Sequence, residues 1–339
     1  MMTNDLPKEN LDPTNPKFWS RGPFKICKKL ITTFSSSGRH RCHPPSPHKT
    51  KHVRLITIGP SHYCEKARWA LDILNNDPSS PVYFTEDAHP PVFQSISSLE
   101  ASNGEASMVP MVVFQESGVQ KVIHDSKEIV FHFCPSLYPI AHKDEILRLE
   151  EYFGSQIGAT LRCYIYFLML RPKYYASLAK LLTTQSSTIE KVLLLKLLEN
   201  GLAKGMIKVM GINSESGEKS LESIRRVFAE VSDGLKLKDG TKKKFIMDSE
   251  TEEVGFTAAD LAFCALVSPL INPPEIKAFV PVDDDEMPPE LILLRDELRM
   301  TLAGQHVMDV YRKYRKTVVP KVVNKHHLRW KEIFTASKL

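Results

Sequence analysis

Hydrophobic and polar residues follow two spacings along this chain, and the spacing changes once. Up to about residue 135, short β-branched runs bounded by Gly, Pro or Ser predict strands at 53–58, 81–85, 109–114 and 119–123. Apolar residues three and four apart predict helices from 62, near 92–99 and from 125. This order, βαβαββα, is typical of a thioredoxin-like α/β domain with a four-stranded mixed sheet.

Beyond Pro139 the strand patterns stop, and helical spacing predicts an all-α second domain. The expected helical ranges are 144–170, 189–209, 221–235, 258–270 and 289–315. We therefore expect four parts: a basic, disordered extension (1–52), the thioredoxin-like domain (53–138), the helical domain (140–318) and a tail (319–339).

Charge and cysteine content limit the classes of function. The net charge of +5 is concentrated in residues 1–52, where ten Lys or Arg outnumber three acids, so residues 53–339 carry −2. A nucleic-acid partner is therefore not expected for the body of the protein. Six scattered cysteines favour a reducing compartment, and no apolar run reaches the about 18 residues that span a bilayer. We expect a cytoplasmic protein, with an organelle as the alternative if the extension is a targeting segment.

Three local sequences occur in an order that resembles the glutathione transferase superfamily. They are the segment 61–68 (SHYCEKAR), the segment 108–112 (MVPMV) and the segment 256–262 (FTAADLA). The first is similar to an uncharacterised, bacterial-type branch of the superfamily. The resemblance covers about residues 53–316 and implies glutathione as the co-substrate, with a homodimer as an option.

The first segment contains two candidate catalytic residues. Ser61 corresponds to the hydroxyl of serine-type transferases, which stabilises the thiolate of glutathione, but Ser is also a favoured helix N-cap, and both roles stay open. Cys64 takes the second place of a Cys-x-x-Cys site whose first place is Ser61. An inert, half-buried thiol is favoured there over a reactive one. Tyr63 is expected to pack in the core.

The resemblance also implies the residues that bind glutathione. The Val109–Pro110 bond is expected to be cis, so that the backbone of Val109 pairs with the cysteinyl unit of glutathione. Asp125 and Ser126 are expected to bind the γ-glutamyl end at a helix N-terminus, where Asp125 and Glu128 also have the spacing of a capping box. A second capping box, Thr257 with Asp260, is assigned to folding. The histidines form no metal site.

Three functions remain open on these grounds. The first is a glutathione-dependent transferase that acts on a small electrophile held between the domains, against residues 161–171 and the final helices. The second is a non-catalytic binding module with the same fold, because fold alone does not fix function. The third is a thiol reductase based on Cys64.

Overall fold

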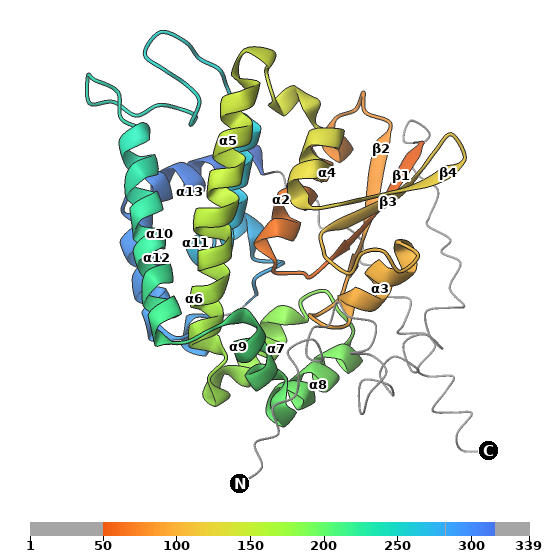
Figure 1. Ribbon diagram of the computed structural model, residues 1–339. Helices are drawn as coiled ribbons and strands as arrows, with labels where there is room; N and C mark the ends of the chain where they lie inside the picture. The colour runs from red at the N-terminus through yellow and green to blue at the C-terminus, as the bar shows by residue number, and fades with distance from the viewer. Residues whose placement is uncertain (1–49, 282, 316–339) are drawn as a thin grey trace, which may run out of the picture.

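The computed structural model describes residues 50–281 and 283–315, and its first domain is built around a four-stranded sheet (Figure 1). The strands are β1 (Lys51–Thr57), β2 (Val82–Ala88), β3 (Met111–Glu116) and β4 (Val119–His124). Their order across the sheet is β2-β1-β3-β4. β1 is parallel to β2 and antiparallel to β3, and β3 is antiparallel to β4. The predicted thioredoxin-like fold class is confirmed.

The alternation of side chains along the strands places helices on both faces of this sheet. Leu55 and Val112 point into the main core, which α2 (His62–Asn76) and α4 (Ser126–Phe133) cover. Ile56 and Met111 point the other way and pack with Ala101, the last residue of α3 (Gln94–Ala101). The ends of β1 and β3 that meet in the middle of the sheet are therefore buried on both faces, and the N-terminus of α2 lies at the edge where β1 ends.

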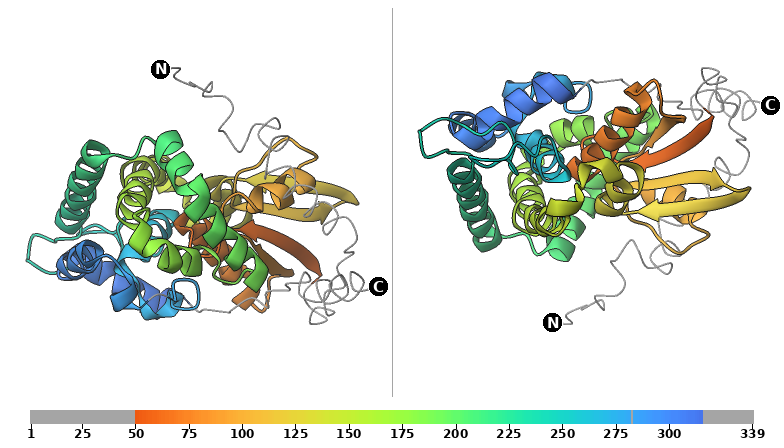
Figure 2. Two further views of the ribbon diagram at one scale, coloured as in Figure 1. Left: turned by 90° about the horizontal axis from the view of Figure 1, so that it is seen from below. Right: turned by 90° about the horizontal axis from the view of Figure 1, so that it is seen from above.

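The second domain is helical, and α11 (Ala258–Ile271) forms its centre. Almost every residue of α11 is buried, which agrees with its uniformly apolar sequence. Around it lie α5 (Lys143–Phe153), continued through one π-helical turn into α6 (Ala159–Met169), and the helices α10 (Ser214–Gly234), α12 (Pro289–Arg299) and α13 (Leu302–Tyr314). Figures 1 and 2 show this bundle beside the sheet.

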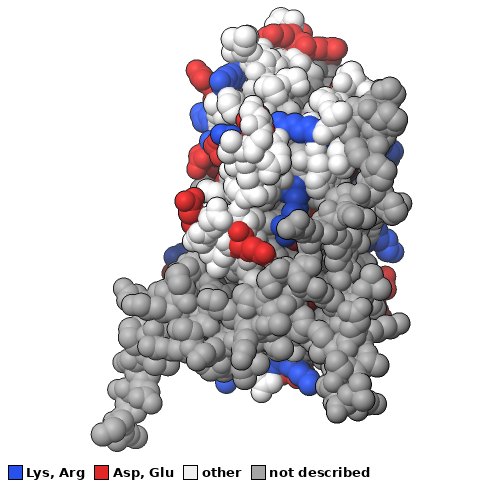
Figure 3. Space-filling view, turned by 90° about the vertical axis from the view of Figure 1, so that its right-hand side faces the viewer, with Lys and Arg blue, Asp and Glu red and all other residues white. Residues whose placement is uncertain are grey.

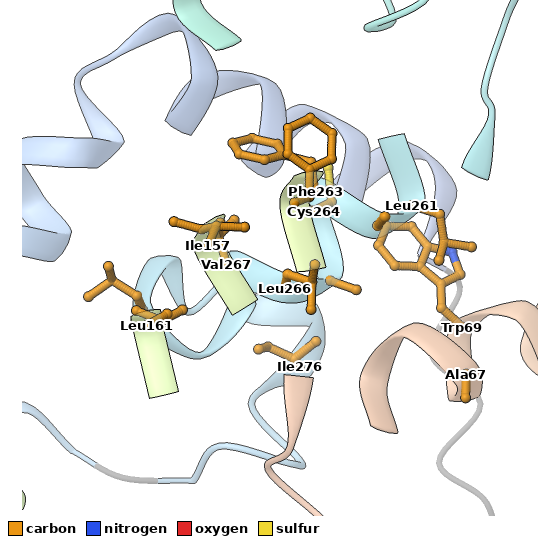
Figure 4. Close-up of a cluster of buried hydrophobic side chains, with 14 of the residues drawn as sticks. Ala67, Trp69, Ile157, Leu161, Leu261, Phe263, Cys264, Leu266, Val267 and Ile276 are labelled. Atoms are coloured by element: carbon orange, nitrogen blue, oxygen red, sulfur yellow. The ribbon is translucent and has the colours of Figure 1, made fainter. Parts of the chain in front are cut away.

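The two domains share one core through α2 and α11. α2 packs against α11, and the close-up in Figure 4 shows Trp69 of α2 beside Leu261 of α11. Trp69 also contacts Tyr311 of α13, with ring centroids 4.6 Å apart. Burying a side chain of this size stabilises the fold by roughly 2–3 kcal/mol, so the helix that opens at Ser61 is held rigidly between the domains.

A third group of helices, residues 172–212, lies below the junction of the domains in Figure 1 and faces the viewer in Figure 2, left, which shows the molecule from below. It contains α7 (Tyr175–Leu182), α8 (Thr188–Leu197) and α9 (Ala203–Met210). α8 and α9 are joined through a kink at Asn200–Gly201, where Gly201 has a φ of 114° that disfavours any side chain. We call this group the α7–α9 segment. Its three helices contact chiefly one another.

Several expected boundaries differ from the structure. β1 begins at Lys51 and β2 runs to Ala88, because both strands pair along their whole length. The range 189–209 is two helices separated by the kink, and α7 was not predicted. The range 289–315 is also two helices, since Thr301 caps α13 by accepting a hydrogen bond from the Gly304 N–H. The expected disordered extension and the tail fall almost wholly outside the described residues.

No helix within residues 50–281 and 283–315 combines the length and the apolar character needed to cross a bilayer.

The α12–α13 junction provides a test of packing. A Cβ atom on Gly304 would lie 2.1 Å from the carbonyl oxygen of Leu298, which is backbone and cannot rotate away. Gly304→Ala is therefore expected to lower the free energy of unfolding by about 1–3 kcal/mol or more. Gly234→Ala is the matched control, because its Cβ would meet nothing within 4 Å. Urea denaturation of both variants checks this; equal stabilities would contradict the close approach.

Candidate functional site

A cavity of about 1060 Å³ lies between the two domains and the α7–α9 segment. Its upper wall is the β1–α2 turn with Ser61 and Tyr63, and the neighbouring wall contains Val109. Arg162 and Tyr166 of α6 line it from the helical domain, as predicted for residues 161–171. Among the described residues, α12 and α13 contribute nothing to its lining, so that part of the expectation was wrong. The α7–α9 segment lines the cavity instead.

Ser61 is the N-cap of α2 and lines the cavity. Its Oγ accepts a long hydrogen bond, 3.5 Å, from the N–H of Cys64, so the predicted cap is present but weak. The hydroxyl proton is not used in that bond. Ser61 therefore combines a hydroxyl group with the positive end of a 15-residue helix, an arrangement that favours an anion beside it.

Cys64 has a different environment, although it lies only one helical turn away. Its side chain is fully buried and is absent from the cavity lining. Burial raises the pKa of the Cys64 thiol to about 11, against smaller opposing effects that include hydrogen bonds to Ile58 and Ser61. A thiol in this environment stays protonated at neutral pH, which favours the inert role over the reductase role.

His62 and Tyr63 attach the first turn of α2 to the helical domain. The Tyr63 hydroxyl donates to the carbonyl of Gly154, 3.0 Å away, and its ring packs against Gly158. Burial lowers the pKa of His62 to about 3, and the Arg162 charge acts in the same direction. His62 is therefore neutral and adds no charge beside Ser61. The expected packing role of Tyr63 agrees with these contacts.

The Val109–Pro110 peptide bond is cis, as predicted. Val109 lines the cavity, and the carbonyl of Pro110 accepts a 3.2 Å hydrogen bond from the N–H of Asp125. This bond connects the loop before β3 to the start of α4. The structure thus brings three of the sequence-predicted elements together: the α2 N-terminus, the cis proline and the α4 N-terminus.

Asp125 and Ser126 begin α4. Asp125 is the N-cap, with its carboxylate 2.8 Å from the N–H of Lys127, so the predicted capping box with Glu128 is not formed. Its backbone has φ 76° and ψ 131°, a sparsely populated region that costs a non-glycine residue about 1–3 kcal/mol. Such strain recurs at ligand sites. Ser126 is buried, and among the described residues no hydrogen bond involves its hydroxyl.

A buried ionic cluster supports the β1–α2 turn from below. Arg68 is fully buried and donates to both oxygens of Glu86 (2.6 and 2.8 Å), to Glu65 (2.7 Å) and to the carbonyl of Gly59 (3.1 Å). Arg315 at the end of α13 donates to Glu65 from the other side, at 2.8 Å. The bond to Gly59, two residues before Ser61, fixes where the turn faces the cavity. Sequence analysis missed this role because charged residues on an amphipathic helix usually face water.

A second ionic cluster attaches the α7–α9 segment to the sheet. His89 follows β2, and its ring contacts Asp87 (3.0 Å) and Glu190 of α8 (2.6 Å). Burial alone would lower the pKa of His89, but Asp87 and Glu190 raise it to about 10. His89 is therefore a buried cation that holds the cavity wall in place. No sequence motif marks it.

Other site types find no support in the described residues. No group of three or more His, Cys, Asp or Glu there could hold a metal ion. Thr257 and Asp260 form the predicted capping box of α11, with the carboxylate 3.1 Å from the Thr257 N–H. On the face in Figure 3, Lys and Arg are interspersed with Asp and Glu over the visible described surface. The described residues on this face therefore form no extended basic patch for a polyanion.

The strand order, the cis proline and the helical second domain define a glutathione-transferase-like fold. No protein-family model matches the chain, and no curated protein matches it. Among solved structures, it is similar to a Xi class glutathione transferase from Natrialba magadii (12% identity, 85% of this chain and 81% of that one, TM-score 0.41).

Two further structures give similar values. A maleylacetoacetate isomerase from Anaeromyxobacter dehalogenans matches at 14% identity over 77% of this chain and 96% of that one, with a TM-score of 0.36. A Tau class glutathione S-transferase from mango, Mangifera indica, matches at 15% identity over 81% and 97%, with a TM-score of 0.38. Because the identities and TM-scores of these matches are low, the fold assignment rests on the strand order of the chain itself.

Proposed function

We propose that this chain binds glutathione against the β1–α2 turn and uses its thiolate on an electrophile held in the cavity. The observation that carries the proposal is that Ser61 and Val109 line the same cavity, on neighbouring walls. A hydroxyl donor at a helix N-terminus suits a thiolate, and the backbone of Val109 suits the cysteinyl unit. Asp125 and Ser126, tied to the cis proline by the Asp125–Pro110 bond, suit the γ-glutamyl end.

The reaction needs the thiolate because the neutral thiol is a weak nucleophile. Ser61 and the first-turn N–H groups of α2 favour loss of the thiol proton to solvent. An electron pair on sulfur then forms a bond to the electrophilic carbon, and the leaving group departs with the electrons of the bond that breaks. In an addition, no group leaves, and the neighbouring carbon takes a proton from solvent.

Variants of Ser61 separate catalysis from capping. One hydrogen bond to a charged group is worth about 1.5–3 kcal/mol, so Ser61→Gly is expected to raise the pKa of the bound glutathione thiol by about one to two units. Gly keeps most of the capping stability, whereas Thr at this position restores the hydroxyl. Thiolate absorbance across a pH series measures the pKa; the same pKa in the wild type and in Ser61→Gly would leave Ser61 as a cap only.

Calorimetric titration of the full chain with glutathione tests binding itself. Ser126→Ala is expected to weaken binding by about tenfold or more, because it removes a donor to the γ-glutamyl carboxylate. Ser155→Ala is the control, since Ser155 is exposed and its hydroxyl bonds only to its own helix, at Glu151 and Tyr152. Binding that is unchanged in Ser126→Ala would contradict this assignment. No binding of glutathione to the wild type would favour the non-catalytic module.

The proposal extends to a homodimer in a reducing compartment such as the cytoplasm. The four described cysteines are all free, which suits such a compartment. Light scattering on the purified chain gives the oligomeric state, and a monomer at micromolar concentration would remove the dimer from the proposal.

A further inference from the structure

Three buried hydrogen bonds connect the end of α13 to the β1–α2 turn. Arg315, the C-cap of α13, donates to one carboxylate oxygen of Glu65 at 2.8 Å. Arg68 donates to the other oxygen of Glu65 at 2.7 Å and also to the carbonyl of Gly59 at 3.1 Å. The side chains of the three charged residues are at most 5% exposed, so water does not compete for these bonds. The path therefore runs from the last helix of the second domain to a point two residues before Ser61.

Further contacts hold the guanidinium of Arg315 in one position. It donates to the carboxylate of Asp72, 2.5 Å away, and lies over the ring of Trp69, 5.6 Å from its centroid. Trp69 in turn contacts Tyr311 of α13. An arginine whose planar group meets two carboxylates cannot shift without breaking a bond. A displacement of the end of α13 is therefore passed on to Glu65.

The thiol of Cys64 lies beneath the same turn and can report its position. It is 0% exposed and forms hydrogen bonds with the backbone of Ile58 and with Ser61, which are the two ends of the turn. The thiol is protected as long as the turn keeps its place. It meets a reagent in solution when the turn opens.

We propose that Arg315 is a positioning residue for Ser61: the end of α13 holds the β1–α2 turn in the orientation that presents the serine hydroxyl to the cavity. Arg315 does not line the cavity and acts through Glu65 and Arg68. A change that withdraws Arg315 releases the turn. The position of the turn is measurable without a ligand, and only the consequence for thiolate stabilisation rests on the proposed function.

Alkylation of Cys64 by iodoacetamide in the full chain, followed by mass spectrometry of its peptides, tests the proposal. In the wild type, Cys64 is expected to react faster than Cys264, which is buried in α11, because the turn opens more easily than the core. In Arg315→Met, the rate at Cys64 is expected to rise by about tenfold or more, since a hydrogen bond to a charged group no longer opposes opening. Equal rates at both cysteines in the wild type would show that the turn opens only with the whole fold, and would overturn the proposal.

Asp72→Asn is the matched control. Asp72 pairs with the same buried guanidinium, but the bonds from Arg315 through Glu65 to Gly59 do not pass through it. The rate at Cys64 is therefore expected to stay within about twofold of the wild type, even where the variant lowers global stability. An unchanged rate in Arg315→Met, or an equal rise in Asp72→Asn, would contradict the positioning role.

A second variant covers the case in which Arg315→Met does not fold. Arg315→Lys keeps a buried cation, but an ammonium lacks the fork that holds two carboxylates at once. Its rate at Cys64 is expected to rise by at least about threefold over that of Asp72→Asn. Equal rates in these two variants would overturn the proposal.

The outcomes distinguish this inference from the proposed function. A response at Cys64 in a chain that binds no glutathione supports the positioning role and removes the transferase. Glutathione binding without a response at Cys64 overturns the inference and leaves the proposed function intact. Where both hold, the pKa of the bound glutathione thiol is expected to rise by about one unit in Arg315→Met and to keep its wild-type value in Asp72→Asn.

Discussion

Replacement of Arg68 by methionine is expected to lower the free energy of unfolding by about 3–5 kcal/mol, because it leaves Glu86 buried without the cation that pairs with it and removes one of the two cations beside Glu65. The side chain of Glu86 is fully buried, and each of its two carboxylate oxygens accepts a hydrogen bond from Arg68. Burial alone would raise the pKa of Glu65, but Arg315 and Arg68 hold it below its ordinary value. Chemical denaturation measures the change.

The control for Arg68→Met removes the arginine of an exposed ion pair of similar geometry. Arg225 donates to both oxygens of Glu297 at 2.8 and 2.7 Å, and both side chains are about half exposed. Arg225→Met is expected to cost no more than about 1 kcal/mol. If Arg68→Met does not fold, the double variant Arg68→Met, Glu86→Gln, which removes one uncompensated charge, is expected to recover part of the stability. A loss below 1 kcal/mol in Arg68→Met would contradict the role of the cluster.

His89→Gln is expected to lower the free energy of unfolding by about 3–5 kcal/mol near pH 6, where it removes a buried cation from between two carboxylates. The effect depends on pH in a defined direction. The pKa of His89 is about 10 in the folded chain and 6.5 as its ordinary value. Its contribution is therefore complete below pH 6.5 and is lost as the pH rises toward 10.

Denaturation of the wild type and His89→Gln at pH 6, 8 and 9.5 checks this slope, and the stability difference is expected to shrink with each step. His142→Gln is the control, because His142 pairs with the exposed Glu252 at the surface, 3.0 Å away. That variant is expected to change stability by less than about 1 kcal/mol. A difference for His89→Gln that is independent of pH would show that its ring is neutral in the fold.

Much of the fold could be predicted because its signals are local. The runs that became β1 to β4 are β-branched and bounded by breakers, and the turn at Ser117–Gly118 lies between two strands that pair residue by residue. The capping box at Thr257 marked the start of the central helix α11 in the same way. Each of these features is fixed by residues within a few positions of one another.

The rest depended on contacts between residues far apart in the sequence. α7 is apolar and short, and nothing in its composition distinguishes it from a buried loop. Arg68 and Glu86 are 18 positions apart, and His89 and Glu190 are 101 apart, so neither pair has a sequence signature. The same reason explains the site: Ser61, Val109 and Asp125 were predicted from a resemblance, whereas the apolar cavity wall of the α7–α9 segment was not.

The position of the α7–α9 segment between two consecutive bundle helices has an evolutionary consequence. α6 ends at Met169 and α10 begins at Ser214, so the cavity wall forms one continuous stretch of sequence. The groups proposed to handle glutathione belong to the other domain. Mutations in residues 172–212 can therefore change which molecule is accepted while the core around α11 is preserved. Duplicated copies of this chain would be expected to diverge fastest there, and exchanging that stretch between relatives would transfer ligand preference as a unit.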